Sequence, residues 1–244
     1  MKLFKINFLI LFFISSFLTI ANAGTGPASV YKVQIYKIEL CDNTSTATEC
    51  EGGVTIYDGG TAGSGDIDIA NTAAGAAAAS LGNLNKAAIG TKYTYMQVTM
   101  GRDFTVSGYA TADSGETCYT NANGANNSAA TGSTTASDQT AVTLYAAFKN
   151  SNLSDELSGM SSLTDTTPTD KTIANGDTHF QWRMKLTNPL IIKGGRIPTV
   201  KIAFGTANAV GATGNMDGGG DGCDANDESI GMYADAPDTS VTFE

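Results

Sequence analysis

The chain has 244 residues, of which 41% are hydrophobic and 16% charged, and its 24 Asp and Glu outnumber 14 Lys and Arg to give a formal net charge of −10. This balance argues against a protein that binds nucleic acid or anionic lipid, since both are bound by neutralising phosphates with Lys and Arg. It suits solubility and divalent cations.

The N-terminus has the three regions of a cleavable secretory signal. Lys2 and Lys5 precede the apolar run 8–20, and residues 21–23 (ANA) place small side chains at the cleavage positions. The apolar run is shorter than the roughly 20 residues that a membrane span needs. We therefore predict a signal peptide over 1–23 and a mature chain that begins at Gly24 without a membrane span. Such a product is secreted or held at the cell surface, with the periplasm as an alternative.

The first strong strand pattern covers residues 30–41, and its alternation changes phase midway. Its two successive apolar sets are Tyr31, Val33 and Ile35, then Tyr36, Ile38 and Leu40. Because alternate residues of a strand point to opposite faces, the strand must either bulge or cross between two sheets near Ile35. Both alternatives fit a β-sandwich, and a barrel is the lesser alternative.

Later segments alternate with one phase, and in each of them we expect the apolar set to face the core. These sets are Met96, Val98 and Met100; Val142, Leu144, Ala146 and Phe148; Phe180, Trp182, Met184 and Leu186; and Val200, Ile202 and Phe204. On the third segment the polar set His179, Gln181, Arg183 and Lys185 is expected to face outward. Short segments at 54–58, 66–70, 104–110, 189–193 and 240–244 add further strands. Together they predict an all-β, antiparallel β-sandwich of the immunoglobulin-like kind.

Three stretches lack strand alternation, namely 59–80, 107–139 and 151–177. The first contains an alanine run that supports a helical turn, and the third contains LSDELSGMSSL, which supports one short helix. The second is polar and of low complexity, so we expect a long loop insertion at about 108–139 that buries no core. No repeat or Pro-rich linker divides the chain, which predicts a single domain over 24–244.

Four cysteines, an even number in an exported chain, favour two disulfides. Of the three pairings, we prefer Cys41 with Cys50, which closes a short hairpin, and Cys118 with Cys223. No two cysteines have C-x-x-C spacing and the chain has a single histidine, so a zinc site is disfavoured.

The order of several phrases resembles a family. A strand ending IELC, a DIDIA segment, the phrase AAIGTKYTYMQVTM and the late PLIIKGGRIPTVKIAFG are similar to prealbumin-like β-sandwich domains of unknown function in exported bacterial proteins. The likeness covers residues 30–205 discontinuously, and the insertion between Gly108 and Gln139 departs from the family. The resemblance implies the fold and export, and it implies no active site.

The acidic stretch DGGGDGCDANDE, residues 217–228, contains five carboxylates. Against a twelve-residue calcium-loop template, carboxylates fall at positions 1, 5 and 12 and a glycine at position 6. Position 3 is glycine and flanking helices are not apparent, so a solvated loop held by a disulfide is the simpler alternative. The calcium hypothesis assigns the metal to Asp217, Asp221 and Glu228, with Asp224 and Asp227 as alternative ligands.

No catalytic signature stands out. His179, on the polar side of its strand, has no nucleophile elbow to serve, and Asp113-Ser114-Gly115 lacks the apolar flanks and the second copy that an aspartic protease needs. We therefore predict a protein that is not an enzyme.

Two binding hypotheses remain. Tyr93, Tyr95 and Tyr145 are either a sugar-stacking platform, if their faces are solvated, or core residues, if they are covered. The β-prone N-terminal segment could join the sheet edge of a neighbouring copy. We accordingly expect a structural, adhesive or filament-forming surface component, with self-assembly or a cell-surface glycan or protein as its partner. The alternative is a calcium-dependent carbohydrate-binding module.

Overall fold

The computed structural model describes residues 24–71, 81–112, 115–125, 129–145, 157–160, 173–174, 176–194, 198, 200–213, 223 and 231–243. Within these residues the fold is all-β with antiparallel strand pairs, which confirms the predicted class. The strands are β1 (Thr25–Gly26), β2 (Ala28–Asp42), β3 (Val54–Asp58), β4 (Asp66–Asp68), β5 (Lys92–Gly101), β6 (Asp103–Thr111), β7 (Thr117–Thr120), β8 (Gly132–Ser133), β9 (Val142–Tyr145), β10 (Leu157–Met160), β11 (His179–Ile191), β12 (Val200–Gly205), β13 (Val210–Thr213), β14 (Gly231–Ala234) and β15 (Asp238–Phe243). The short 3-10 helices are η1 (Gly60–Ala62), η2 (Leu84–Lys86) and η3 (Ala136–Asp138). The predicted signal peptide lies outside the described residues.

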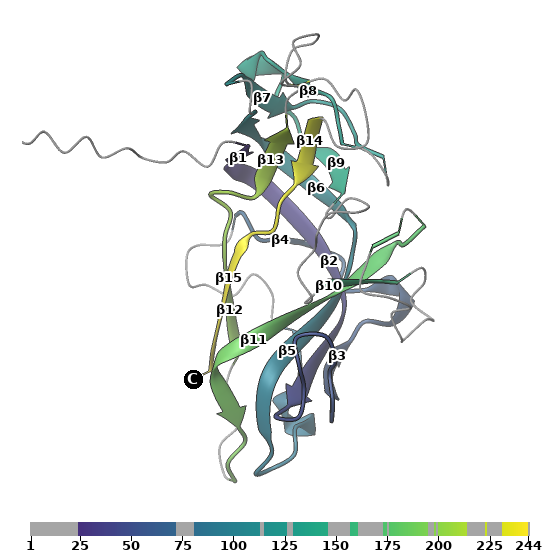
Figure 1. The fold of residues 1–244 in the computed structure, drawn as a ribbon, viewed down its shortest axis with the longest axis vertical. Coiled ribbons are helices and arrows are strands. Elements are labelled where there is room, and N and C mark those ends of the chain that lie inside the picture. The colour runs from purple at the N-terminus through teal and green to yellow at the C-terminus, as the bar shows by residue number, and fades with distance from the viewer. Residues whose placement is uncertain are drawn as a thin grey trace, which may run out of the picture.

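The centre of the main sheet is formed by β2 and by β5 with β6, which follow each other along its edge (Figure 1). The C-terminal half of β2 pairs with β5 and its N-terminal half pairs with β6. Only Arg102 separates β5 from β6, so these two act as one kinked strand that runs antiparallel to β2. Strands β3 and β4 pair with the other edge of β2, and β11, β9 and β7 pair with the other edge of β5 and β6.

The phase change in the first strand is a bulge. The pairing of β2 with β5 shifts register between Ile35 and Lys37, which leaves Tyr36 as the extra residue. Because the bulge adds one residue, the apolar side chains before and after it point to the same side of the sheet. Ile35 and Ile38 accordingly line the same apolar cavity. Of the two predicted alternatives, the bulge is therefore correct, and β2 stays within one sheet while its partners change.

A two-stranded ribbon of β12 and β15 packs against the apolar side of the curled main sheet. Its half-buried core-facing residues are Val200, Ile202, Phe204, Val241 and Phe243. The predicted apolar sets of β5, β9 and β11 also lie in or against this core, whereas Ala146 and Phe148 lie outside the described residues.

The far end of the molecule holds β1, β13 and β14 beside β6, β7 and β8 (Figure 1). Here the expectation of a polar excursion without core residues is wrong for part of 107–139, because Cys118, Thr120 and Ala130 are buried. Pairing of β7 with β6 and β8 explains why a polar sequence forms strands there.

The short helix expected within LSDELSGMSSL is also wrong, since residues 157–160 form β10 and pair with β11. Tertiary pairing overrides a weak local helix preference at this position. In the part of the chain that the structure describes, no helix has the length and apolarity to cross a membrane.

Candidate functional site

Polar side chains gather on the side of the main sheet that faces away from the apolar core. Register places them in two rows, each crossing neighbouring strands. The closed row consists of Glu39, Gln97 and Arg183, which stand opposite one another on β2, β5 and β11. The open row consists of Asp58, Lys37, Thr99 and Gln181, on β3, β2, β5 and β11. The two rows are two residues apart on β2, β5 and β11 and therefore share one face of the sheet.

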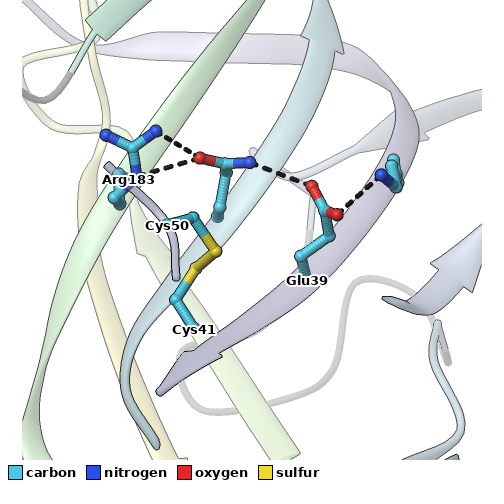
Figure 2. Close-up of polar contacts among 6 residues, drawn as sticks. Glu39, Cys41, Cys50 and Arg183 are labelled. Carbon is cyan, nitrogen blue, oxygen red and sulfur yellow. Dashed lines mark hydrogen bonds and ion pairs between the residues drawn. A yellow bond between two sulfur atoms is a disulfide. The ribbon is translucent and has the colours of Figure 1, made fainter. Parts of the chain in front are cut away.

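The closed row is a continuous chain of hydrogen bonds (Figure 2). Arg183 donates from Nε to Gln97 Oε1 at 2.9 Å and from Nη2 to the same oxygen. Gln97 in turn donates from Nε2 to Glu39 Oε2 at 2.9 Å. Glu39 Oε1 completes the chain with an ion pair to Lys37 Nζ at 2.6 Å.

A disulfide-closed loop covers this row. Cys41 and Cys50 form the predicted bridge, with Cα atoms 5.1 Å apart, and Arg183 donates from Nη1 to the Ala47 carbonyl at 2.7 Å. Within the loop, Thr44 donates to the Asp42 carboxylate from both its hydroxyl and its backbone N–H, which lowers the pKa of Asp42. The loop is thus both locally ordered and anchored to the row.

The expectation that Gln181 and Arg183 face solvent is wrong, because each side chain is only 4% exposed. The predicted alternation is correct, since both lie opposite the apolar set, but the polar face is itself covered. For Arg183 the cover is the Cys41–Cys50 loop. For Gln181 it includes Met160 of β10 and residues around η1, which enclose a cavity of about 200 Å³ along the open row.

Two members of the open row have unused hydrogen-bonding groups. Thr99 is 4% exposed and its buried hydroxyl has no hydrogen-bond partner. The Gln181 amide makes no hydrogen bond to the described residues, although its side chain borders the same cavity. Buried polar groups are normally paired, so the Gln181 amide at this cavity leaves room for a polar occupant, whereas the Thr99 hydroxyl is itself covered.

His179 extends the polar face beyond the open row. It pairs with Gly101, and its ring meets the ring of Tyr36 edge to face with centroids 4.6 Å apart. Its Nδ1 lies 2.8 Å from the hydroxyl of Thr178. Burial lowers the pKa of His179, and the carboxylate of Asp103 partly opposes that shift.

Arg102, at the kink between β5 and β6, is fully buried and was not singled out from the sequence. It donates from Nη1 to the carbonyls of Ala174 and Asp177 at 3.0 and 2.7 Å. Its backbone N–H donates to the Thr178 carbonyl at 3.1 Å. Burial lowers the pKa of Arg102, against the opposing charge of Asp177. These contacts fix the segment that leads into β11.

The predicted calcium ligands Asp217, Asp221, Asp224, Asp227 and Glu228 lie outside the described residues. Their neighbour Cys223 is described, and it forms the predicted disulfide with Cys118, with Cα atoms 5.3 Å apart. Among the residues that the structure covers, no three His, Cys, Asp or Glu side chains gather as a metal site.

The tyrosines named from the sequence are not an exposed platform. Tyr93 is 2% exposed and its hydroxyl accepts a hydrogen bond from the Ala88 N–H, while Tyr95 and Tyr145 are half-buried. An exposed tyrosine lies elsewhere: Tyr109 is 41% exposed and contacts the half-buried Tyr119 across β6 and β7, with ring centroids 5.6 Å apart. Strict alternation from Phe104 and Val106 could have placed Tyr109 on the outer side.

Two disulfides are typical of chains that fold outside the reducing cytoplasm. Comparison with known proteins identifies no family: no protein-family model, no curated protein and no solved structure matches the chain.

Proposed function

We propose that the chain is a non-catalytic, exported component of the cell surface with a structural, adhesive or filament-forming role. Copies assemble through strand edges at one end of the molecule. Nucleic acid is not a partner in this proposal, because the chain is strongly acidic.

The observation that carries the proposal is a groove of about 580 Å³ between the end of β11 and the end of β15. β15 pairs with β12 on one edge and, within the described residues, has no strand on the other. Beyond Trp182, β11 likewise has a described partner on one edge only. Unpaired edges are templates for an added strand.

Exposed apolar side chains mark the same end. Ile89 is 74% and Ile191 46% exposed, and the backbone between them is tied together by a hydrogen bond of 2.9 Å from the Gly90 N–H to the Ile192 carbonyl. Contiguous exposed apolar groups are characteristic of interaction surfaces. The strand that enters the groove is not the N-terminal segment considered from the sequence, because β2 is paired on both edges at the centre of its own sheet.

The test is the oligomeric state of the mature protein across a range of concentrations, measured by light scattering after size exclusion. We expect concentration-dependent oligomers that the double variant Ile89→Lys, Ile191→Lys abolishes. Tyr109→Lys, at the other end of the molecule, is the control and should leave them intact. A protein that is monomeric at every concentration would remove the basis of the proposal.

A second candidate, the calcium-dependent carbohydrate-binding module, is favoured by the pair Tyr109 and Tyr119. The exposed ring of Tyr109 and the half-buried ring of Tyr119 lie on the β6–β7 hairpin, which also carries Cys118, the disulfide partner of Cys223 in the acidic stretch. Aromatic rings beside an ordered cation are a suitable surface for stacking a sugar.

Thermal unfolding with calcium and with chelator tests this candidate. Calcium bound only by the native state stabilises it by roughly 2.7 kcal/mol at a hundredfold excess over the dissociation constant. We expect a rise in the midpoint that Asp221→Ala removes. Equal midpoints with calcium and chelator would leave a solvated, disulfide-held loop and end the calcium hypothesis.

A further inference from the structure

The open row borders a cavity that neither proposed role uses. We propose that this cavity is a binding site for a small, uncharged, hydroxyl-rich molecule such as a single sugar ring or a cyclic polyol. The site does not involve the acidic stretch or the strand edges, so it is independent of both candidate functions.

The first argument is unsatisfied hydrogen-bonding capacity. The cavity of about 200 Å³ is bordered by Thr99, whose own hydroxyl is covered, and by Gln181, whose amide makes no hydrogen bond to the described residues. A hydroxyl and an amide both donate and accept. Vicinal hydroxyl groups of a ligand do the same, so they can pair with both the N–H₂ group and the carbonyl oxygen of the Gln181 amide.

The second argument is charge. One cation and one anion, Lys37 and Asp58, border the cavity, and both already have partners. Lys37 is ion-paired with Glu39, and Asp58 Oδ1 accepts a hydrogen bond from the Gly60 N–H at 2.9 Å. A balanced lining in a strongly acidic protein does not favour a phosphate or a carboxylate. A single carboxylate also falls short of the several oxygen ligands that a hard cation requires.

The third argument is the apolar part of the lining. Tyr36 and Met160 border the same cavity. The Tyr36 ring is held by its edge-to-face contact with His179 and by its hydroxyl, which donates to Gln34. Small-ligand sites combine apolar walls with a few placed polar groups. A sugar ring, with C–H faces and a hydroxyl rim, matches both parts.

The experiment is NMR titration of the oxidised mature protein with D-glucose, D-galactose and myo-inositol, in chelator so that calcium has no part. The Gln181 side-chain N–H₂ signals, assigned by their absence in Gln181→Leu, report on the site directly. We expect saturable shifts with at least one of the three and a dissociation constant in the millimolar range. Gln181→Leu should weaken binding by about tenfold, the equivalent of one lost hydrogen bond, whereas Thr99→Val, which removes a covered hydroxyl, should leave binding unchanged.

Both variants should remain folded, because neither replaced group has an internal partner, and thermal unfolding verifies this. Thr111→Val, an exposed threonine away from the cavity, is the matched control and should bind as the parent does. The proposal is overturned if none of the three compounds gives saturable shifts, if Gln181→Leu binds like the parent, or if inorganic phosphate binds in their place. Blank titrations beside intact oligomers would refute this site and leave the assembly proposal standing.

Discussion

The closed row and the open row differ by two residues on each shared strand, yet the closed row is complete and the open row is not. Arg183, Gln97 and Glu39 are hydrogen-bonded to one another, and the Ala47 carbonyl from the disulfide loop accepts a hydrogen bond from Arg183 Nη1. Thr99 and Gln181 are covered instead by Met160 of β10 and residues around η1, which leave a cavity between, and neither side chain hydrogen-bonds to the described residues. Both rows are buried, and they differ in whether the covering residues supply a hydrogen-bond partner: the Ala47 carbonyl does so for Arg183, and no described residue does so for Gln181.

The largest effect is expected from Arg183→Met. The substitution leaves Gln97 Oε1 and the Ala47 carbonyl without their donor, and hydrogen bonds from a charged group are worth about 1.5–3 kcal/mol. We expect a loss of about 3 kcal/mol in the free energy of unfolding, measured with urea. Lys185→Met, an exposed lysine on the same strand, should change it by less than about 0.5 kcal/mol. Equal effects of the two substitutions would mean that the closed row is not a stabilising unit.

Removing the loop's disulfide should come next. Replacing Cys41 and Cys50 by serine frees a loop with a sequence separation of 9, for which chain entropy predicts a loss of about 2.6 kcal/mol. The Arg183 Nε–H signal in NMR spectra should also lose its protection from solvent exchange. Serine at both Cys118 and Cys223 is the control, since it should destabilise the protein while leaving that signal protected. Unchanged protection without Cys41–Cys50 would show that the loop is not the cover.

Thr99→Val should stabilise the protein, in contrast to the two changes above. A buried hydroxyl without a partner costs stability, so replacing it with a methyl group should raise the free energy of unfolding by about 1 kcal/mol. The matched control on the same strand is Thr94→Val, whose hydroxyl donates to the Asp42 carbonyl at 2.8 Å and whose loss should cost about 1 kcal/mol. Destabilisation by both would mean that the Thr99 hydroxyl is satisfied in solution.

The smallest effect is expected from the pH dependence of stability that His179, beyond the open row, contributes. Burial lowers the pKa of His179 in the folded state below its unfolded value of about 6.5. The unfolded state therefore binds the proton first, and stability falls as the pH decreases from about 6.5 toward the folded pKa. Urea unfolding at pH values on both sides of 6.5 should show this decline, and His179→Gln should reduce it. An identical pH profile for the variant would assign the decline to other groups.

Much of the architecture could be predicted from local pattern. The bulge near Ile35 follows from a phase change that no regular strand permits. Both disulfides follow from an even cysteine count and one short spacing. The apolar set of β5 follows from strict alternation, because a side-chain period of two leaves no other assignment once one face is buried.

The site could not be predicted in the same way, because it depends on what covers each face. The alternation of β11 predicts that Gln181 and Arg183 face solvent. In the structure the loop at Ala47 covers Arg183, and Met160 of β10 lies beside Gln181. Tyr93 is core for a similar reason. Arg102 has no local signal at all, since its partners Ala174 and Asp177 are more than seventy residues away.

The order of strands across the main sheet also has a consequence for the time at which the protein folds. Val98 of β5 pairs with Ile38 of β2 on one side and with Trp182 of β11 on the other. Strands from the early, middle and late parts of the chain must therefore meet before the centre of the sheet exists. Such non-local pairing makes folding slow and leaves apolar strands exposed until the last of them arrives. The centre of the sheet is thus completed only after β11 has been synthesised.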